Sequence, residues 1–411
     1  MQWLSRVMLK LLIENTLVKV VGMERGYKIL GNYIRLVDER NRDLAVTKLL
    51  GVSISKKFIP SIANIVGTDL SNYKIVRTGQ FAYGPVTSRN GEKISIAYLD
   101  EEDCIISSSY TVFEVENKEE LDPEYLMLWF SRPEFDRYAR YKSHGSVREI
   151  FDWNELCMVE LPVPDIEKQR KIVKAYKVIT DRIALKQKIN DNLTAQCSVD
   201  YALMLNGYTI ESEDLPDGWR QGSIGSYCDV KSGFAFKSDW WTTEGYKVIK
   251  IANIVNNTID LDSCDCVIAE HALKANNFYV KSGDILIAMT GATTGKIGIV
   301  PLTDEPIVVN QRVGKFFLGE NPIEKAPFLY STLLYSRVIR HLQPDGTAGS
   351  AQDNLSADNI KDIAIILPEN SIIEDFNKRH IPHLKMMMSN WTEIRSLNKM
   401  SEVILQTLSS Y

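Results

Sequence analysis

The stretch from residue 165 to residue 205 constrains the fold most, because it has the pattern of one helix too long for a single globular domain. Its apolar residues recur three or four positions apart, with charged residues between them, as expected for a helix with one apolar stripe: Ile172, Tyr176, Ile179, Ile183, Ile189, Leu193, Cys197, Tyr201 and Leu205. At 1.5 Å per residue the helix would be about 60 Å long. It is therefore predicted to be a spacer or a coiled-coil arm.

The segments on either side of this stretch resemble each other. Each has short β-rich runs broken by turns, then a helical stretch, a small-residue loop and a Leu-Pro pair. In the first segment the predicted strand-like runs are residues 28–36, 49–53, 74–76, 94–98, 105–107 and 110–115. Thr78-Gly79 corresponds to Ser282-Gly283, and Gly145-Ser146 corresponds to Gly349-Ser350, with the same offset of 204 positions. Two distant landmarks with one offset indicate an internal repeat.

The tail of the chain has the same pattern as the central helix. Residues 372–411 carry a second apolar stripe, which Pro382 is expected to kink or delay: Phe376, Leu384, Met387, Trp391, Ile394, Leu397, Ser401, Ile404 and Leu408. Because neither stripe can remain exposed to water, we expect the two helices to pair antiparallel, with a globule at each end and a pseudo-twofold between the halves.

The predicted fold class is therefore α/β (α+β), with two similar mixed α/β domains separated by two long helices in an antiparallel coiled coil. The expected segments are an N-terminal extension, helical or upstream of the true start (1–26), a first domain (27–164), a central spacer helix (165–205), a second domain (206–370) and a C-terminal spacer helix (371–411). The first domain is expected to end with helices beginning at Asp122-Pro123 and near Glu134.

Composition excludes few classes of function. With 45% hydrophobic and 25% charged residues and a net charge of −5, the chain is ordinary globular protein rather than one that coats nucleic acid non-specifically. Its six scattered cysteines suggest reduced thiols in a cytoplasmic protein. Charged residues interrupt every apolar run in residues 1–26, so we expect no membrane span.

Catalytic motifs fail on spacing. The run from Gly291 to Lys296 resembles a phosphate loop, but residue 290 is not glycine and residue 297 is not serine or threonine, which favours a turn between strands. Asp122-Pro123-Glu124-Tyr125 lacks the second proline of an adenine-methyltransferase motif. The five histidines show no paired metal spacing. We therefore expect no catalytic site, no metal and no cofactor.

What remains is binding chemistry. Cations interleave with aromatics between Arg137 and Arg148, a mixture that suits phosphates and bases, although the tyrosines could equally be packed and the cations simply solvated. In the second half, forked side chains that can make two hydrogen bonds to one base edge cluster in turns. The candidate DNA-binding residues are Lys57, Tyr83, Arg89, Asn90, Lys93, Arg140, Lys142, Ser146, Arg148, Lys231, Lys237, Thr290, Thr293, Thr294, Lys296, Gln311, Arg312, Ser350 and Gln352.

This arrangement resembles the DNA specificity subunits of type I restriction-modification systems. The matching stretches are residues 27–41 and 50–56, Leu161-Pro162-Val163-Pro164 followed by Glu167-Lys168-Gln169-Arg170, Leu215-Pro216-Asp217-Gly218-Trp219, Ser232-Gly233-Phe234-Ala235-Phe236, Ser282-Gly283-Asp284-Ile285-Leu286 and residues 291–300. The tail departs from the pattern, with Glu374-Asp375-Phe376 where the first helix has Glu167-Lys168-Gln169. Docking at the second helix is accordingly the weaker expectation.

The resemblance implies a non-catalytic subunit in which each target-recognition domain reads half of a bipartite, asymmetric site in double-stranded DNA. It further implies that the helices set the spacing and dock two methyltransferase subunits, and that restriction (helicase/nuclease) subunits complete the nuclease. The expected subunit-interface residues are Ile172, Tyr176, Ile179, Ile183, Leu193, Phe376, Met387, Trp391, Ile394 and Leu408. Two alternatives are a self-contained DNA-modifying enzyme and a coiled-coil scaffold that does not bind DNA.

Overall fold

The computed structural model describes residues 26–61, 67–88, 90–144, 149–342 and 354–408. The chain forms two compact units, one from residues 1–181 and 397–411 and the other from residues 182–396. Two long helices, α5 (Ile166–Leu205) and α11 (Asn370–Thr407), each contribute to both units. The predicted N-terminal extension, residues 1–26, lies outside the described residues except for Gly26.

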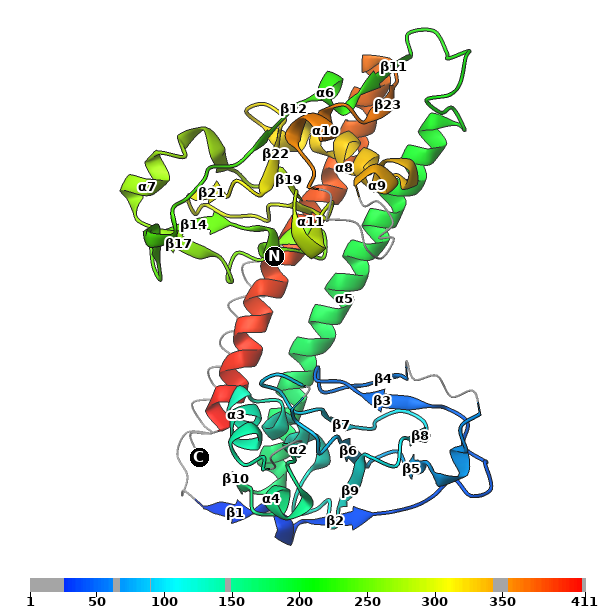
Figure 1. Ribbon diagram of the computed structural model, residues 1–411, viewed down its shortest axis with the longest axis vertical. Coiled ribbons are helices and arrows are strands. Elements are labelled where there is room, and N and C mark those ends of the chain that lie inside the picture. Colours follow the sequence, from blue (N-terminus) through cyan, green and yellow to red (C-terminus); the bar gives the residue numbers. More distant parts are fainter. Residues whose placement is uncertain (1–25, 62–66, 89, 145–148, 343–353, 409–411) are drawn as a thin grey trace. The chain divides into compact units, whose positions relative to one another are not determined.

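The first unit is built from short strands followed by three short helices (Figure 1). Its central sheet has the order β2-β9-β6-β7, and β1-β10, β3-β4 and β5-β8 form antiparallel pairs. Its elements are β1 (Tyr27–Ile29), η1 (Leu30–Asn32), β2 (Ile34–Val37), β3 (Leu50–Val52), β4 (Phe58–Pro60), η2 (Leu70–Asn72), β5 (Lys74–Val76), β6 (Phe81–Tyr83), β7 (Ile96–Tyr98), β8 (Cys104–Ile106), β9 (Thr111–Val115), α2 (Pro123–Phe130), α3 (Pro133–Tyr141), α4 (Trp153–Cys157) and β10 (Glu160–Pro162).

The second unit contains two larger sheets, ordered β12-β22-β19-β20-β16-β15 and β13-β17-β14-β21-β18, and the pair β11-β23. Its elements are β11 (Arg220–Ser223), α6 (Ile224–Tyr227), β12 (Asp229–Ser232), η3 (Ser238–Trp240), β13 (Trp241–Thr242), β14 (Tyr246–Ile249), η4 (Ile251–Asn253), β15 (Ile254–Val255), β16 (Thr258–Ile259), β17 (Asp265–Val267), α7 (Ala269–Leu273), η5 (Asn276–Phe278), β18 (Tyr279–Val280), β19 (Ile285–Ala288), η6 (Gly291–Thr293), β20 (Ile297–Ile299), β21 (Ile307–Val309), β22 (Val313–Phe317), η7 (Pro322–Glu324), α8 (Ala326–Leu334), α9 (Ser336–Leu342), α10 (Ala357–Lys361) and β23 (Ala364–Leu367).

The internal repeat is present in the order of the elements. In each unit the opening strand pairs antiparallel with the strand that precedes a long helix, β1 with β10 and β11 with β23. Three short helices come before that closing strand, α2 to α4 in the first unit and α8 to α10 in the second. The predicted fold of two similar mixed domains is therefore confirmed.

Two buried amides attach these repeated helices to the long ones. Gln169 on α5 accepts a hydrogen bond from the backbone nitrogen of Asp122 and donates to the carbonyls of Glu120 and Pro164. Asn377 on α11 accepts from the backbone nitrogen of Phe328 at 2.8 Å, at the start of α8. Each amide satisfies a backbone group at a helix start that would otherwise be unpaired.

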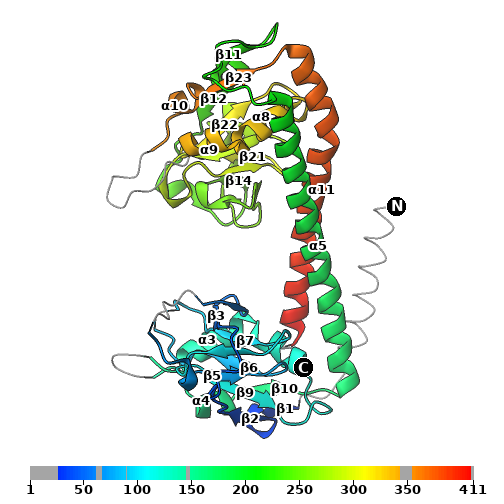
Figure 2. The ribbon, with the colours of Figure 1, turned by 90° about the vertical axis from the view of Figure 1, so that its right-hand side faces the viewer.

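Within the second unit α5 and α11 lie side by side in both ribbon views (Figures 1 and 2). Lys186 contacts Asn390 and Glu393, whereas Cys197, further along α5, contacts His380 and His383. As the residue number of the contacting residue increases along α5, that of its partner decreases along α11. The helices are therefore antiparallel, as predicted.

The structure corrects three sequence expectations. Helix α11 runs from Asn370 through Pro382, so the proline does not delay it, because buried Phe376, Leu384 and Met387 hold both sides of it in the core. The run predicted as one strand at residues 28–36 is broken by η1. Strand β6 (Phe81–Tyr83) was missed because all three residues are buried, so no alternating pattern marks it. No helix in the described ranges carries a span suited to crossing a bilayer. The expectation about residues 1–26 falls outside the described residues, except for Gly26.

Candidate nucleic-acid interface

Two polar turns meet at one edge of the second unit. The β19–β20 turn carries Lys296, and the β21–β22 turn carries Gln311 and Arg312. The backbone nitrogen of Met289, at the end of β19, donates to the carbonyl of Arg312 at 3.0 Å, which joins the two turns. All three polar side chains are exposed, so forked donors and acceptors and a cation lie on neighbouring turns, as base and phosphate contact requires.

The threonines of the first turn differ from this expectation. The Thr294 hydroxyl donates to the carbonyl of Gly291 at 2.7 Å and closes the turn. The hydroxyls of Thr290 and Thr293 are shielded from solvent and have no hydrogen-bond partner. Gly291 itself has φ +78°, which favours glycine, and η6 begins there. The segment is the strand-to-strand turn that the failed phosphate-loop spacing indicated.

The segment after β12 adds an aromatic cluster beside these turns. The backbone nitrogen of Gln311 donates to the carbonyl of Phe234. The ring centroids of Phe234 and Trp240 are 6.4 Å apart. Trp240 also stacks on His271 with ring centroids 4.1 Å apart. Of the lysines predicted here, Lys237 lies 5.5 Å from the Trp240 ring centroid, and Lys231 lies over Phe317 and is paired with Asp229.

Sequence reasoning missed two further lysines in this aromatic cluster. Lys274 lies 4.9 Å from the Trp240 ring centroid and Lys250 lies 3.5 Å from that of Trp241. The sequence signal that could have indicated this cluster is the pair of adjacent tryptophans, Trp240 and Trp241, shortly after Lys237. A half-buried aromatic surface carrying three lysines combines the two chemistries that bind bases and phosphates.

In the first unit a buried ion pair holds two polar segments against α3. Asp136 accepts from the Lys56 ammonium, in the β3–β4 turn, and from the backbone nitrogen of Ile94, before β7. Burial lowers the pKa of Lys56 below its ordinary value of 10.5, an effect that the bond to Asp136 opposes. Two of the predicted cations, Lys57 and Lys93, are exposed next to these anchored residues.

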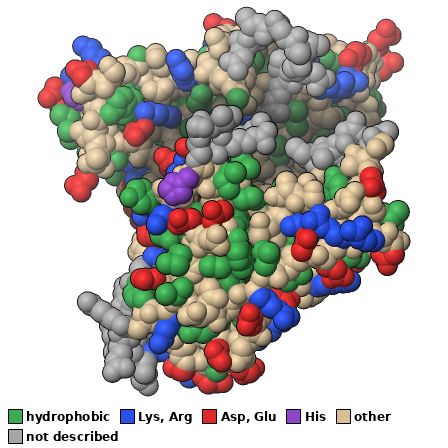
Figure 3. All heavy atoms as spheres, turned by 60° about the horizontal axis from the view of Figure 1, so that its bottom comes forward, with side chains coloured by type: hydrophobic (Ala, Val, Ile, Leu, Met, Phe, Trp, Pro, Cys, Tyr) green, Lys and Arg blue, Asp and Glu red, His purple; other side chains and the backbone are tan. Residues whose placement is uncertain are grey.

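Two further predicted cations in the described part of the first unit have acidic partners. Arg140 pairs with Glu149, and the Lys142 ammonium lies 3.5 Å from a carboxylate oxygen of Glu155. Asn90 donates to the carbonyl of Val86 at 3.2 Å, which is a turn contact. On the face shown in Figure 3, cationic and acidic side chains are interspersed. Interspersed charge favours contact at selected positions over non-specific attraction.

One predicted DNA-binding residue is buried, and five lie outside the described residues. Tyr83 is fully buried in β6 between Phe113 and Phe151, so its prediction as a DNA contact is wrong. Both faces of β6 are covered, so none of its side chains reaches the surface. Arg89, Ser146, Arg148, Ser350 and Gln352 lie outside the described residues, and the structure places every other candidate.

Most of the predicted subunit-interface residues are buried within this chain or pack against its core. Ile172, Ile179, Phe376, Met387, Trp391 and Leu408 are buried, and Leu193 and Ile394 pack against the core of the second unit. Tyr176 and Ile183 are half-buried. A stripe covered by the chain's own helices and sheets cannot also bind another subunit, so the six buried residues are corrected to internal core residues.

The sequence matches one protein-family model and is similar to named members of that family. The sequence model described as "Type I restriction modification DNA specificity domain" matches residues 56–195 and 216–384. The MjaVIII type I restriction enzyme specificity subunit of Methanocaldococcus jannaschii is 25% identical over 278 residues, which span 64% of this chain and 64% of that subunit. The HindI specificity subunit of Haemophilus influenzae is 20% identical over 434 aligned residues, spanning 87% of this chain and 92% of that protein.

A solved structure is also similar in fold. The S subunit of a type I restriction-modification system from M. genitalium superposes with a TM-score of 0.56 at 15% identity, covering 93% of this chain and 95% of that one. At this identity the similarity concerns the fold alone.

Proposed function

Because this chain belongs to the type I restriction-modification DNA specificity family, we propose that it is the non-catalytic subunit that reads DNA for a methyltransferase complex. Each target-recognition domain reads one half of a bipartite, asymmetric site in double-stranded DNA. The observation that carries this proposal is the duplicated domain, closed by β1-β10 in one unit and β11-β23 in the other and attached each time to a long helix.

In the second target-recognition domain, we assign base reading to the two joined turns. Arg312 and Gln311 can each make two hydrogen bonds to a base edge, and Lys296 supplies a phosphate contact. In the first domain, Lys57 and Lys93 are the corresponding exposed cations, positioned by the bonds of Asp136 to the turn and to Ile94. The lysine-bearing aromatic cluster around Trp240 supplies a second surface for the DNA backbone.

A second apolar face on α5 supports docking of methyltransferase subunits. Leu185, Ile189, Val199 and Leu203 are exposed on α5, with Leu203 at 69%, although the opposite stripe of the same helix is buried. Ile189, which the sequence pattern assigned to the buried stripe, therefore belongs to the exposed face. Leu185 and Val199 are fourteen residues apart, as are Ile189 and Leu203, so both pairs repeat on one helix face at heptad spacing. An exposed apolar stripe of this kind marks a protein–protein interface.

The experiment that tests the function is a comparison of methylated bases across the host genome with and without this gene. One bipartite motif should lose methylation on deletion. Exchange of residues 27–164 for those of a relative should change the bases in one half of the motif only. Altered bases in both halves, or a motif that survives deletion, would overturn the proposal.

The alternative of a self-contained enzyme is tested with the purified chain. Methyl transfer to DNA without partner subunits would support that alternative and contradict a purely recognising role. The structure gives the methyltransferase-like tetrapeptide at residues 122–125 a structural role instead. Asp122 caps α2 by accepting hydrogen bonds from the backbone nitrogens of Glu124 and Tyr125.

A further inference from the structure

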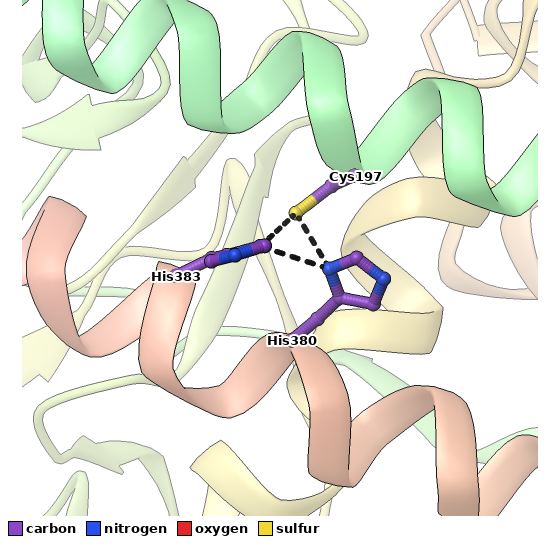
Figure 4. Close-up of side chains that lie close together, drawn as sticks. All are labelled: Cys197, His380 and His383. Atoms are coloured by element: carbon purple, nitrogen blue, oxygen red, sulfur yellow. Dashed lines mark hydrogen bonds between the residues drawn. The ribbon is translucent and has the colours of Figure 1, made fainter.

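Three metal-ligating side chains converge between the long helices of the second unit. Cys197 projects from α5, and His380 and His383 project from adjacent turns of one face of α11 (Figure 4). The Cys197 Sγ lies 3.5 Å from Nδ1 of His380 and 3.8 Å from Nδ1 of His383. The two Nδ1 atoms are 2.9 Å apart. The expectation that no histidines have paired metal spacing is therefore wrong, because His380 and His383 are three residues apart on one helix.

These separations are close to those that a tetrahedral ion imposes. With Zn–S of about 2.3 Å and Zn–N of about 2.0 Å, tetrahedral angles place sulfur and nitrogen about 3.5 Å apart and two nitrogens about 3.3 Å apart. One sulfur–nitrogen distance, 3.5 Å, matches the first value, and the other, 3.8 Å, is slightly longer. Movement of the imidazoles apart by a few tenths of an ångström gives the second.

The Nε2 of His380 makes no hydrogen bond in the structure, but an acidic side chain lies close to it on the far side of the ring. The Nε2 of His380 lies 3.4 Å from a carboxylate oxygen of Asp200, which is one turn from Cys197 on α5. A histidine that binds a metal through one nitrogen commonly presents the other N–H to a carboxylate, which fixes its tautomer and orientation. Asp200 is held by Gln196, which donates to it at 2.8 Å.

We propose that Cys197, His380 and His383 bind one Zn²⁺ ion that clamps α5 to α11 in the second unit. Cys197 and His380 are buried, and the half-buried His383 leaves a side from which water can fill the fourth position. On binding, the thiol proton passes to solvent and the thiolate sulfur and two neutral imidazole nitrogens coordinate the ion, so metal uptake releases protons. Thiolate and imidazole together favour Zn²⁺ over magnesium or calcium.

The ion would act on helix pairing rather than on DNA reading. The three ligands lie on α5 and α11, whereas the candidate reading turns lie between β19 and β22. A ligand that binds only the folded chain stabilises it in proportion to the logarithm of its concentration over Kd. Zinc is therefore expected to raise the Tm of the chain without being required for its fold.

The test uses the full, untagged chain after dialysis against a chelator. Zn²⁺ titration should show one site per chain, with a rise in Tm, and Co²⁺ should give the absorption of a tetrahedral ion together with a thiolate charge-transfer band. Cys197→Ser should weaken binding by roughly a hundredfold or more and remove the charge-transfer band. Asp200→Asn, which keeps all three ligands, should weaken binding by about 10-fold to 100-fold.

Matched controls separate this site from adventitious binding. Cys228→Ser removes another buried thiol of the same unit, and His341→Asn removes an exposed histidine, and neither should change zinc affinity. Folding of each variant is followed by circular dichroism, and Asp200→Asn keeps the proposal testable if Cys197→Ser does not fold. Less than half an ion per chain, or Cys197→Ser affinity equal to the parent's, would overturn the site and leave a hydrogen-bonded histidine pair. Neither result depends on DNA binding.

Discussion

Asn390 on α11 donates a hydrogen bond of 2.7 Å from its side-chain nitrogen to the side-chain oxygen of Asn190 on α5. Both amides are buried between the two helices. Asn190 donates in turn to the carbonyl of Met387, and the Lys186 ammonium donates to the Asn390 oxygen at 3.0 Å. A polar pair that can be satisfied in only one alignment fixes the register of two helices.

Replacement of one of these asparagines should cost more than replacement of both. Asn190→Leu leaves the Asn390 amide buried without its acceptor and should lower the free energy of unfolding by about 1–3 kcal/mol. The double variant with Asn390→Leu should recover part of that loss, because no amide group of the pair then remains unpaired. Urea unfolding of the four proteins gives the coupling energy. Asn192→Leu, at an exposed position of α5, is the control and should change the free energy of unfolding little. If Asn190→Leu changes it no more than that, the hydrogen-bonded asparagine pair does not stabilise the fold.

The stability of the second unit should depend on acid through Glu393. Burial would raise the pKa of Glu393, but hydrogen bonds and charge from Lys186 and Arg182 outweigh it and hold the pKa below the ordinary 4.5. Since the folded state lowers this pKa, its stabilisation is complete above about pH 4.5 to 5 and is lost as pH falls through the folded pKa. Glu393→Gln should cost about 1 kcal/mol at pH 7, because the Arg182 side chain is 38% exposed and water screens it.

The measurement for Glu393 is the difference in unfolding free energy between parent and Glu393→Gln from pH 7 to pH 3. The difference should shrink as the pH falls below 4.5. Glu374→Gln, at an exposed position of the same helix, should give no such pH-dependent difference. A constant difference across the range would show that the carboxylate charge is not what stabilises the pair.

Gln169 should be among the most costly residues to truncate in the first unit. It is completely buried, and Gln169→Ala leaves an amide nitrogen and two carbonyls without their partners. The expected loss is about 3 kcal/mol. Thermal unfolding checks this. The control is Gln187→Asn on the same helix, where the half-buried side chain donates to Asp191 and little should change. A loss under 0.5 kcal/mol would mean that water replaces the amide.

The comparison of Gln169 with Asn377 shows how far the sequence could predict the fold. The apolar stripes predicted both long helices, and equal offsets predicted the repeat, because both are regular patterns along the chain. The departure at Glu374-Asp375-Phe376 looked like a weakness of the second half. Asn377 nevertheless does there for α8 what Gln169 does for α2, from a slightly different position.

The candidate site was less predictable because it depends on contacts between distant residues. The turns holding Lys296 and Arg312 could be read as polar, but their joining through Met289 requires the sheet order β22-β19-β20. The burial of Tyr83 and the approach of Cys197 to His380, 183 residues later, likewise depend on packing that no local pattern carries.

The two reading turns should separate specificity from general affinity. Arg312→Ala should cost about 1–3 kcal/mol in binding of the assembled complex and relax preference at one base pair, because a bidentate contact is lost. Lys296→Ala should weaken binding to all sequences similarly and lower the slope of log K against log salt by about one. Lys281→Ala, before the start of β19 and so at the other end of that strand, is the control. Equal losses on cognate and unrelated duplexes for Arg312→Ala would exclude it from base reading.

Lengthening both long helices should change the gap between half-sites and leave the bases unchanged. Insertion of seven residues after Asp181 in α5 and after Ser396 in α11, where the chain divides into its units, keeps each apolar stripe in phase. The insertion adds about 10.5 Å of helix. At about 3.4 Å per base pair that length corresponds to at most about three extra base pairs.

Rotation also limits the change in the gap. Each added base pair turns the second half-site around the DNA axis by about 34°, whereas two added helical turns of protein rotate the recognition domain little. The preferred increase in the gap should therefore be one to three base pairs. Mapping methylated sites in cells that carry the lengthened chain measures the gap. A seven-residue insertion after Asp304, in the connection between β20 and β21, is the control that adds chain without lengthening either long helix. A gap that stays constant in the lengthened chain would show that α5 and α11 tether the two recognition domains without setting the distance between their half-sites.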